Sequence, residues 1–238
     1  MKKVALCLHG LFDSNYDKSS KGLDGFEYIR KNILSKADVD VFIHSWEPHR
    51  KDEILGLYSP VDSVFESPVD FSSLVEERGL DSLQGSPRPP GTILSHFYSV
   101  QRALSLVKDG YDIVVKSRFD LGRINRNSSG PGHKNPFPVQ CIAFNPYLDM
   151  SRMYVADWQY MDTDGPADMW FYSSPENMSH FTRLFDLLRD KYFFKDSEYA
   201  VSLGGQKGDI PNAIKLYKWF MMDVGLWGKI TPLKTEWV

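Results

Sequence analysis

The stretch YDIVVKSRFDL, Tyr111–Leu121, decides the fold, because an apolar strand core runs directly into charged residues. Side chains of a strand alternate between its two faces, so a continuing strand would place all the charged groups on one face. That face carries Lys116, Arg118 and Asp120. The opposite face carries Ser117, Phe119 and Leu121. In open α/β sheets, ligands bind just past the carboxyl ends of the strands. The stretch therefore predicts a binding site for an anionic or metal-bound ligand.

Strand-like and helix-like segments alternate on both sides of this stretch. Strands are expected at Lys3–Leu8, Val39–His44, Val139–Phe144 and Ala167–Tyr172. Helices are expected at Gly25–Ser35, Phe71–Arg78, Ser95–Lys108, Ser174–Arg189 and Pro211–Val224. The first strand, helix and strand predict a βαβ unit with a parallel pair. The pattern indicates an α/β fold in a single domain that spans residues 1–238.

Two polar segments interrupt the pattern. The region from Gly56 to Gly91 ends in GSPRPPG, a composition that predicts a mobile loop or a lid. Asn125–Asn135, NRNSSGPGHKN, predicts a surface excursion rather than a domain linker.

Composition narrows the classes of function. The 28 basic and 31 acidic residues give a net charge of −3, which offers no global field for nucleic acid or anionic membranes. Two cysteines predict reduced thiols rather than a disulfide framework. The apolar stretch Val4–Leu8 is too short for a signal peptide core, and no apolar run is long enough for a transmembrane segment. We expect a soluble cytoplasmic protein without a nucleic-acid partner, and the oligomeric state stays open.

Four segments together resemble a known family. They are KVALCLHGLF, VDVFIHSWEP, YDIVVKSRFDL and ADMWFYSSPENMSHF. The chain is similar to nucleotide-sugar-dependent glycosyltransferases of the GT-A fold, and most of all to the small, divergent members found in bacterial polysaccharide clusters and in large DNA viruses and phages. The resemblance implies a GT-A-like, Rossmann-like central sheet, mixed but mostly parallel, with helices on both faces. It also implies a nucleoside-diphosphate sugar as donor, a glycan or similar acceptor, and, for a viral protein, the host cytoplasm.

The resemblance places a metal site at the end of the middle strand. Family members carry an Asp-x-Asp motif there, whose carboxylate holds a divalent cation on the donor pyrophosphate. Only Asp120 carries over as a ligand, because Ser117–Asp120 reads SRFD. Mn²⁺ or Mg²⁺ would be the cation. Lys116 and Arg118 are candidates for binding the donor phosphates, since a guanidinium forks onto phosphate oxygens. A simple surface ion pair between Arg118 and Asp120 is the alternative.

The remaining site residues are expected at the ends of other strands. His9 and Gly10 at the end of the first strand, and His44 and Trp46 at the end of the second, are candidates for contacts with the nucleotide. Each could instead be a structural hydrogen-bonding or core residue. An inverting transfer needs a general base for the acceptor hydroxyl. Asp168 is the first choice for this base and Asp157 the second, and either could instead cap a turn.

Two other classes of function compete with the transferase. LHGLFDS, residues 8–14, also resembles the oxyanion loop of α/β-hydrolases, but the chain contains no Gly-x-Ser-x-Gly, and His180 is the only histidine late enough to complete a triad. The other alternative is a sugar- or nucleotide-binding module without catalysis. The absence of the first Asp of the Asp-x-Asp motif is the reason to consider it.

Overall fold

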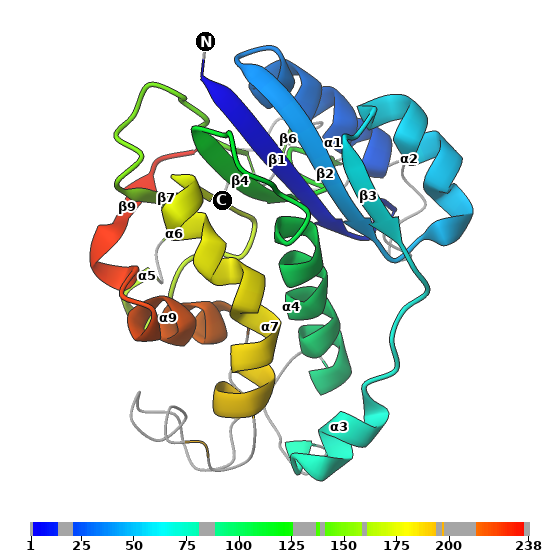
Figure 1. Cartoon of the computed structure of the whole chain (residues 1–238), viewed down its shortest axis with the longest axis vertical. Helices are drawn as coiled ribbons and strands as arrows, with labels where there is room; N and C mark the ends of the chain where they lie inside the picture. The colour runs from blue at the N-terminus through cyan, green and yellow to red at the C-terminus, as the bar shows by residue number, and fades with distance from the viewer. Residues whose placement is uncertain are drawn as a thin grey trace.

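The protein is built around one seven-stranded sheet. The structure, a computed structural model, describes residues 2–13, 21–80, 89–125, 137–138, 141–158, 161–193, 197 and 213–235. Across the sheet the strands are β3 (Asp62–Phe65), β2 (Asp38–Ser45), β1 (Lys3–Gly10), β4 (Ile113–Arg118), β8 (Trp170–Ser173), β7 (Met153–Ala156) and β9 (Ile230–Leu233) (Figure 1). The pairs β3–β2, β2–β1, β1–β4 and β7–β9 are parallel, while β4–β8 and β8–β7 are antiparallel. The expected mixed, mostly parallel α/β sheet is confirmed.

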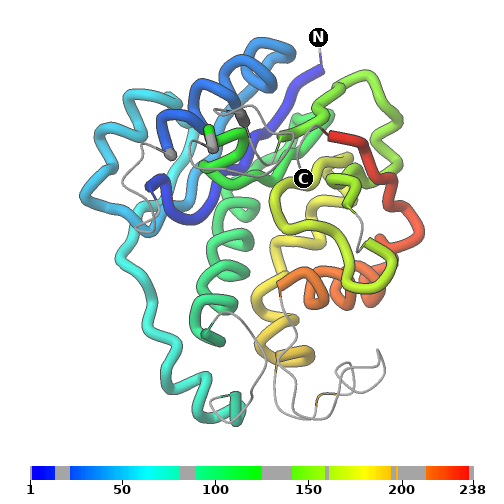
Figure 2. The backbone as a smooth tube through the Cα atoms, turned by 180° about the vertical axis from the view of Figure 1, so that it is seen from behind, coloured from blue at the N-terminus to red at the C-terminus, as the bar shows by residue number. Residues whose placement is uncertain are grey.

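Helices cover both faces of this sheet (Figures 1 and 2). One face packs against α1 (Lys21–Ile29), which continues as a π-helical turn over Arg30–Leu34, and against α2 (Lys51–Tyr58). The other face packs against α4 (Pro90–Leu104), α6 (Pro175–Ser179), α7 (Leu184–Leu187) and α9 (Ala213–Asp223). Shorter elements are α3 (Ser72–Glu77), α5 (Met161–Asp164) and the two-stranded pair of β5 (Ile124–Asn125) and β6 (Phe137–Pro138). Within the described ranges, no helix has the length and apolar character needed to cross a membrane.

The alternation that the sequence predicts for the middle strand is confirmed. Val114 packs into the core on the α4 side of the sheet, and Ile113 and Val115 pack on the α1 side. Phe119 also lies in the α1-side core, although β4 itself ends at Arg118. The even-numbered charged residues therefore belong to the α4 side, at the carboxyl end of a buried parallel strand.

The helix after the proline-rich segment begins earlier than the sequence suggests. Its first residue is Pro90 rather than Ser95, so part of GSPRPPG is helical. Proline suits the first turn of a helix, because the N–H it lacks would have no helical acceptor there. Ile93 and Leu94 extend the apolar stripe backwards from Phe97, and all three are buried. The loop prediction for residues 81–88 lies outside the described residues.

Two further expectations are wrong in part. Cys141–Phe144 is not a strand. The backbone carbonyl of Cys141 instead accepts a side-chain hydrogen bond, from Trp170 Nε1 at 3.0 Å. The helix expected over Ser174–Arg189 is divided into α-helical, 3₁₀ and π segments, although Ser174 is its N-cap as predicted and accepts from the Asn177 N–H. Residues 126–135, from the expected surface excursion, are not described. Cys7 and Cys141 are buried free thiols.

A glycine brings α1 against the end of β4. A Cβ on Gly25 would lie 1.9 Å from the carbonyl oxygen of Phe119 and 3.3 Å from the Cα of Asp120. Only a residue without a side chain permits this approach. The position of the Asp120 turn is therefore linked to the packing of α1.

Candidate functional site

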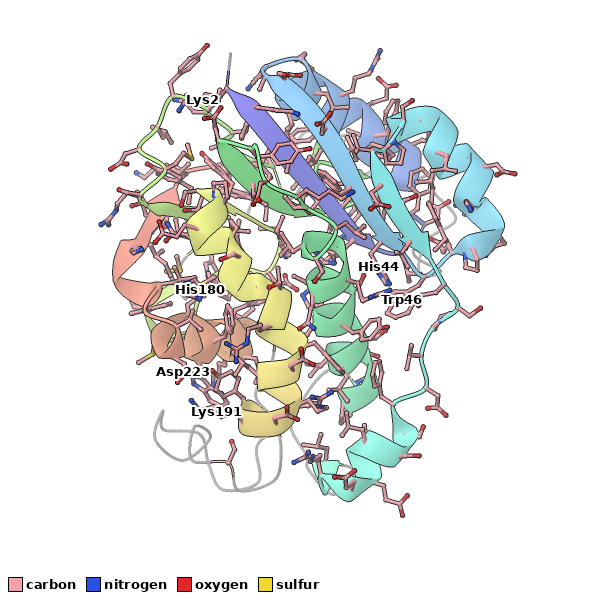
Figure 3. The ribbon with its side chains drawn as sticks, viewed as in Figure 1. Lys2, His44, Trp46, His180, Lys191 and Asp223 are labelled. Carbon is pink, nitrogen blue, oxygen red and sulfur yellow. The ribbon has the colours of Figure 1, made fainter. Side chains whose placement is uncertain are left out.

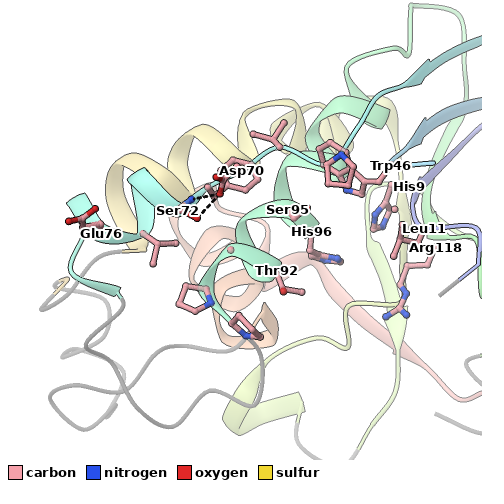
Figure 4. Close-up of a pocket in the computed structure, with 18 of the residues that line it drawn as sticks. His9, Leu11, Trp46, Asp70, Ser72, Glu76, Thr92, Ser95, His96 and Arg118 are labelled. Atoms are coloured by element: carbon pink, nitrogen blue, oxygen red, sulfur yellow. Dashed lines mark hydrogen bonds between the residues drawn. The ribbon is translucent and has the colours of Figure 1, made fainter. Parts of the chain in front are cut away.

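A pocket of about 810 Å³ opens where β1, β2 and β4 end. The segment 68–76 and the first turns of α4 form its other walls. His9 and Arg118 lie together at one end, and Asp70, Ser72 and Glu76 lie at the other (Figure 4). Apolar residues line much of the space between, namely Leu11, Trp46, Pro68, Val69, Phe71, Val75, Pro89 and Pro90. The pocket therefore has a polar end at the strand termini and an apolar extension that leads to the acidic side chains of Asp70 and Glu76.

A second pocket has a similar volume but a different place. It measures about 840 Å³ and is lined by α1 residues together with residues 141–143 and 234–235. None of the candidate site residues from the sequence lines it. Because ligands of α/β sheets bind at the carboxyl ends of strands, the first pocket is the candidate site.

The centre of the polar end is a two-pronged ion pair. Arg118 Nε donates to Asp120 Oδ1 at 2.8 Å, and Nη2 donates to Oδ2 at 2.7 Å. Arg123 Nη1 lies 3.5 Å from Asp120 Oδ2. Asp120 is only 8% exposed, so this pair is not the solvated surface pair that the sequence left open as an alternative. Burial opposes the charge of Arg118, but Asp120 and Asp168 outweigh it and raise the pKa of Arg118.

His9 lines the same end of the pocket, with its ring edge-on to that of His96. It is 2% exposed, and neither ring nitrogen has a hydrogen-bond partner among the described residues. Burial, followed by the charges of Lys116, His96, Arg118 and His44, holds the pKa of His9 well below its usual range. An unpartnered buried polar group costs free energy. Both nitrogens are almost completely covered, so a ligand atom in the pocket would relieve that cost once a small movement of the ring exposes one of them.

Lys116 lies behind the pocket and is fully buried. Its Nζ donates to the backbone carbonyl of Asp168 and stands 4.8 Å from the ring centre of Phe171 and 5.3 Å from that of Tyr217. Burial lowers the pKa of Lys116 to about 7. Lys116 does not line the pocket, so it holds the turn that carries Asp168 rather than the ligand itself.

Replacing Lys116 by Met is expected to change how stability depends on pH. An unfolded lysine keeps its proton up to about pH 10, so between about pH 7 and pH 9 the unfolded chain binds one more proton than the folded chain. The free energy of unfolding of the parent should therefore rise with pH in that window, by up to about 1.4 kcal/mol per pH unit from this residue. Urea unfolding of both proteins across the window should give a flatter dependence for K116M, and equal slopes would contradict a buried lysine with a lowered pKa.

Asp168, the first choice for a general base, lies beside the polar end. Its Oδ2 is 3.9 Å from Nε2 of His96, and the two side chains are 16% and 15% exposed. His96 Nε2 also lies 3.0 Å from the hydroxyl of Tyr217. Burial raises the pKa of Tyr217 well above its usual range, so that hydroxyl keeps its proton and can donate to His96. Asp168 stands behind His96 and Arg118, which themselves line the pocket.

Of the two candidates on β2, Trp46 lines the pocket and His44 does not. His44 Nδ1 lies 2.7 Å from the hydroxyl of Ser99 and Nε2 lies 2.8 Å from Glu66 Oε1, so both nitrogens already have protein partners. This arrangement gives no support to its expected contact with a nucleotide and suits a structural role. Trp46 lies next to His44 (Figure 3) and stacks on Tyr98 with ring centres 5.4 Å apart.

Gly10 also lines the pocket and shapes the turn after β1. Its φ of +96° is a conformation that favours glycine, and its carbonyl accepts from the Trp46 N–H at 3.3 Å. The turn is fixed further by Glu47, a buried carboxylate that accepts from the backbone N–H groups of Phe12 and, at 3.1 Å, Asp13. The sequence reasoning missed Glu47, although it directly follows Trp46.

Asp157, the second choice for a base, is not brought to the pocket. It follows β7, whose end lies at the same edge of the sheet as that of β4, but β8 separates the two strands. Strand spacing puts β7 about 10 Å from β4. The backbone N–H of Asp157 bonds to the Leu233 carbonyl. His96 takes the place beside Asp168 instead. In the sequence, His96 directly precedes Phe97 at the edge of the apolar stripe of α4. A histidine that only packs against the core would be found at the same kind of position, so the sequence does not single His96 out.

The residues at the polar end do not fit a divalent cation. Both oxygens of Asp120 already accept from Arg118, and within the described ranges no three His, Cys, Asp or Glu side chains come together as ligands. The nearby charged groups are Lys116, Arg118 and Arg123 against Asp120 and Asp168. Hard cations bind where carboxylate oxygens are free to coordinate them, and here both oxygens of the Asp120 carboxylate are engaged by Arg118. The expected metal role of Asp120 therefore has no support from its surroundings.

Comparisons with known proteins give structural likenesses but no match by sequence. No protein-family model matches the chain, and a search of curated proteins finds no match. Among solved structures, the apo form of mouse xyloside xylosyltransferase 1 is similar with a TM-score of 0.44 and 9% identity, over 98% of this chain and 84% of that one. The strand order defines the fold of this chain, independently of this likeness.

Proposed function

We propose that this protein is a glycosyltransferase that moves a sugar from a nucleoside diphosphate to a glycan or similar acceptor. The observation that carries the proposal is the polar end of the pocket, where Arg118 and the unpartnered His9 meet at the carboxyl ends of β4 and β1. A basic group and a free hydrogen-bonding group suit a diphosphate. The apolar extension beyond Trp46 offers room for the base and ribose or for the sugar.

The proposed reaction needs charge stabilisation at one side and proton removal at the other. The bond from the anomeric carbon to the diphosphate oxygen breaks, and the electron pair leaves with the diphosphate. The acceptor oxygen bonds to the anomeric carbon, and its proton passes through one water molecule to the carboxylate of Asp168, which is 16% exposed but does not itself line the pocket. Arg118 would stabilise the growing charge on the leaving diphosphate. Asp168 would act as the general base beside His96.

A thermal-shift screen of UDP-, GDP- and dTDP-sugars is expected to find at least one that stabilises the protein. Binding to the folded state raises the free energy of unfolding by about 2.7 kcal/mol at a ligand concentration of 100 Kd. Stabilisation by none of them, with or without Mn²⁺, would contradict the proposal.

His9→Phe is the matched variant for this screen. Because neither nitrogen of His9 has a protein partner, the unliganded variant should be as stable as the parent or more so. The stabilisation by the nucleotide sugar should shrink in H9F. An unchanged shift would exclude His9 from the ligand contacts.

A sugar- or nucleotide-binding module without catalysis is the second candidate. The replacement of the first Asp of Asp-x-Asp by Arg118 favours it. The two candidates differ in one readout: the module would be stabilised by a nucleotide sugar but would neither hydrolyse it nor transfer the sugar to any glycan.

A further inference from the structure

The guanidinium of Arg118 occupies the place where the resemblance expects a metal ion. It lines the pocket and sits against the carboxylate of Asp120, the residue expected to be a metal ligand. The fork engages Nε and Nη2, and Nη1 has no hydrogen-bond partner among the described residues. On the basis of the function proposed above, we propose that this site binds a nucleoside diphosphate without a divalent cation, with Arg118 as the group that neutralises the leaving diphosphate.

The burial of the pair makes Arg118 a fixed cation rather than a mobile one. Asp120 is 8% exposed and Arg118 is 25% exposed. A two-pronged pair fixes both the plane and the position of the guanidinium. A divalent cation chelated between the two oxygens of Asp120 would have to displace Arg118, which would separate a largely buried carboxylate from its partner. Separating such a pair is costly, because each charge must then be solvated again or paired anew.

The charged groups around the Arg118–Asp120 pair do not favour a cation. Three basic side chains, Lys116, Arg118 and Arg123, surround two carboxylates. Even when Lys116 is neutral, the remaining charges cancel, so a cation gains no net attraction from these groups. His9 and His96 lie in contact at a ring-centre distance of 5.2 Å and line the same end of the pocket. A diphosphate could accept from the unengaged Nη1 of Arg118, whereas a metal would find both oxygens of Asp120 already paired.

The test measures the affinity for UDP, GDP and dTDP by calorimetry, once in EDTA and once in excess Mn²⁺. The parent is expected to bind at least one of them in EDTA, with an affinity that Mn²⁺ changes less than about threefold. Arg118→Gln is expected to weaken that binding in EDTA by at least about tenfold, since hydrogen bonds to charged groups are the strong ones. Mn²⁺ should not restore it. Arg183→Gln, an exposed arginine away from the pocket, is the control and should bind as the parent does.

Two further variants keep the test decisive. Arg118→Lys retains the positive charge but cannot make the two-pronged hydrogen bonds of a guanidinium. It replaces R118Q as the test variant if circular dichroism shows that R118Q does not fold. It should bind more weakly than the parent in EDTA. Asp120→Asn keeps the shape of the carboxylate but releases Arg118, and it should bind more weakly in both buffers.

The results separate this inference from the function on which it rests. Binding that appears only with Mn²⁺, is lost in D120N and survives in R118Q would overturn the cation-free site and leave the glycosyltransferase standing. No binding of any of the three nucleotides in either buffer would overturn both.

Discussion

Replacing Asp168 by Asn is expected to lower the turnover number for glycosyl transfer by about 10³-fold, because an amide cannot take up the acceptor proton. The carboxylate lies beside His96 and close to Arg118, and its backbone carbonyl is held by Lys116. The amide has the same shape and keeps the turn in place. The affinity for the donor nucleotide should therefore change little, so the loss should fall on turnover rather than on binding.

The control for this experiment is Asp157→Asn. Asp157 follows β7, which lies two strands away from β4 and ends at the same edge of the sheet. It is therefore a carboxylate of the same chemistry that lies farther from the pocket. Turnover should stay close to that of the parent in D157N and collapse in D168N. The opposite pattern would move the base to Asp157, and two fully active variants would leave the acceptor hydroxyl without a carboxylate base.

The middle strand shows what a sequence reveals about a site. Strand periodicity alone places Lys116 and Arg118 on one face and Phe119 on the other, and the structure agrees. Local periodicity works here because the β4 core is buried on both sides, which leaves the backbone little choice of register. The same reasoning could not tell whether Asp120 would face a metal or an arginine, since both outcomes place a carboxylate at the strand end.

Residues brought in by tertiary packing were beyond that reasoning. His96 lies on α4 and Tyr217 on α9, and they meet only because both helices cover the same face of the sheet. His44 was placed correctly at a strand end, but its partners, Ser99 and Glu66, are far away in sequence. Whether a strand-end histidine has a partner depends on such distant contacts. His9 has none and His44 has two, although the two residues stand opposite each other on β1 and β2.

Replacing Gly25 by Ala is expected to destabilise the fold by about 3 kcal/mol, in spite of the better helix propensity of alanine. Gly25 lies within α1, where alanine would ordinarily gain about 1 kcal/mol over glycine. The new Cβ, however, would stand 1.9 Å from the carbonyl oxygen of Phe119. The obstructing atom belongs to the backbone and cannot rotate away, so α1 or the end of β4 must shift. The steric cost should exceed the gain in propensity.

Gly56→Ala supplies the control, since Gly56 is exposed within α2 and a Cβ there meets nothing within 4 Å. It should stabilise the fold by about 0.5 to 1 kcal/mol, so the two variants should differ in sign in the same urea unfolding experiment. Asp120 follows Phe119 directly, and a shift of that turn would pull its carboxylate away from Arg118. G25A should therefore also bind nucleoside diphosphates more weakly at temperatures where it is still folded, and G56A should bind as the parent does. A G25A variant more stable than the parent would show that α1 does not approach the end of β4 this closely, and the site would then not depend on that helix for its shape.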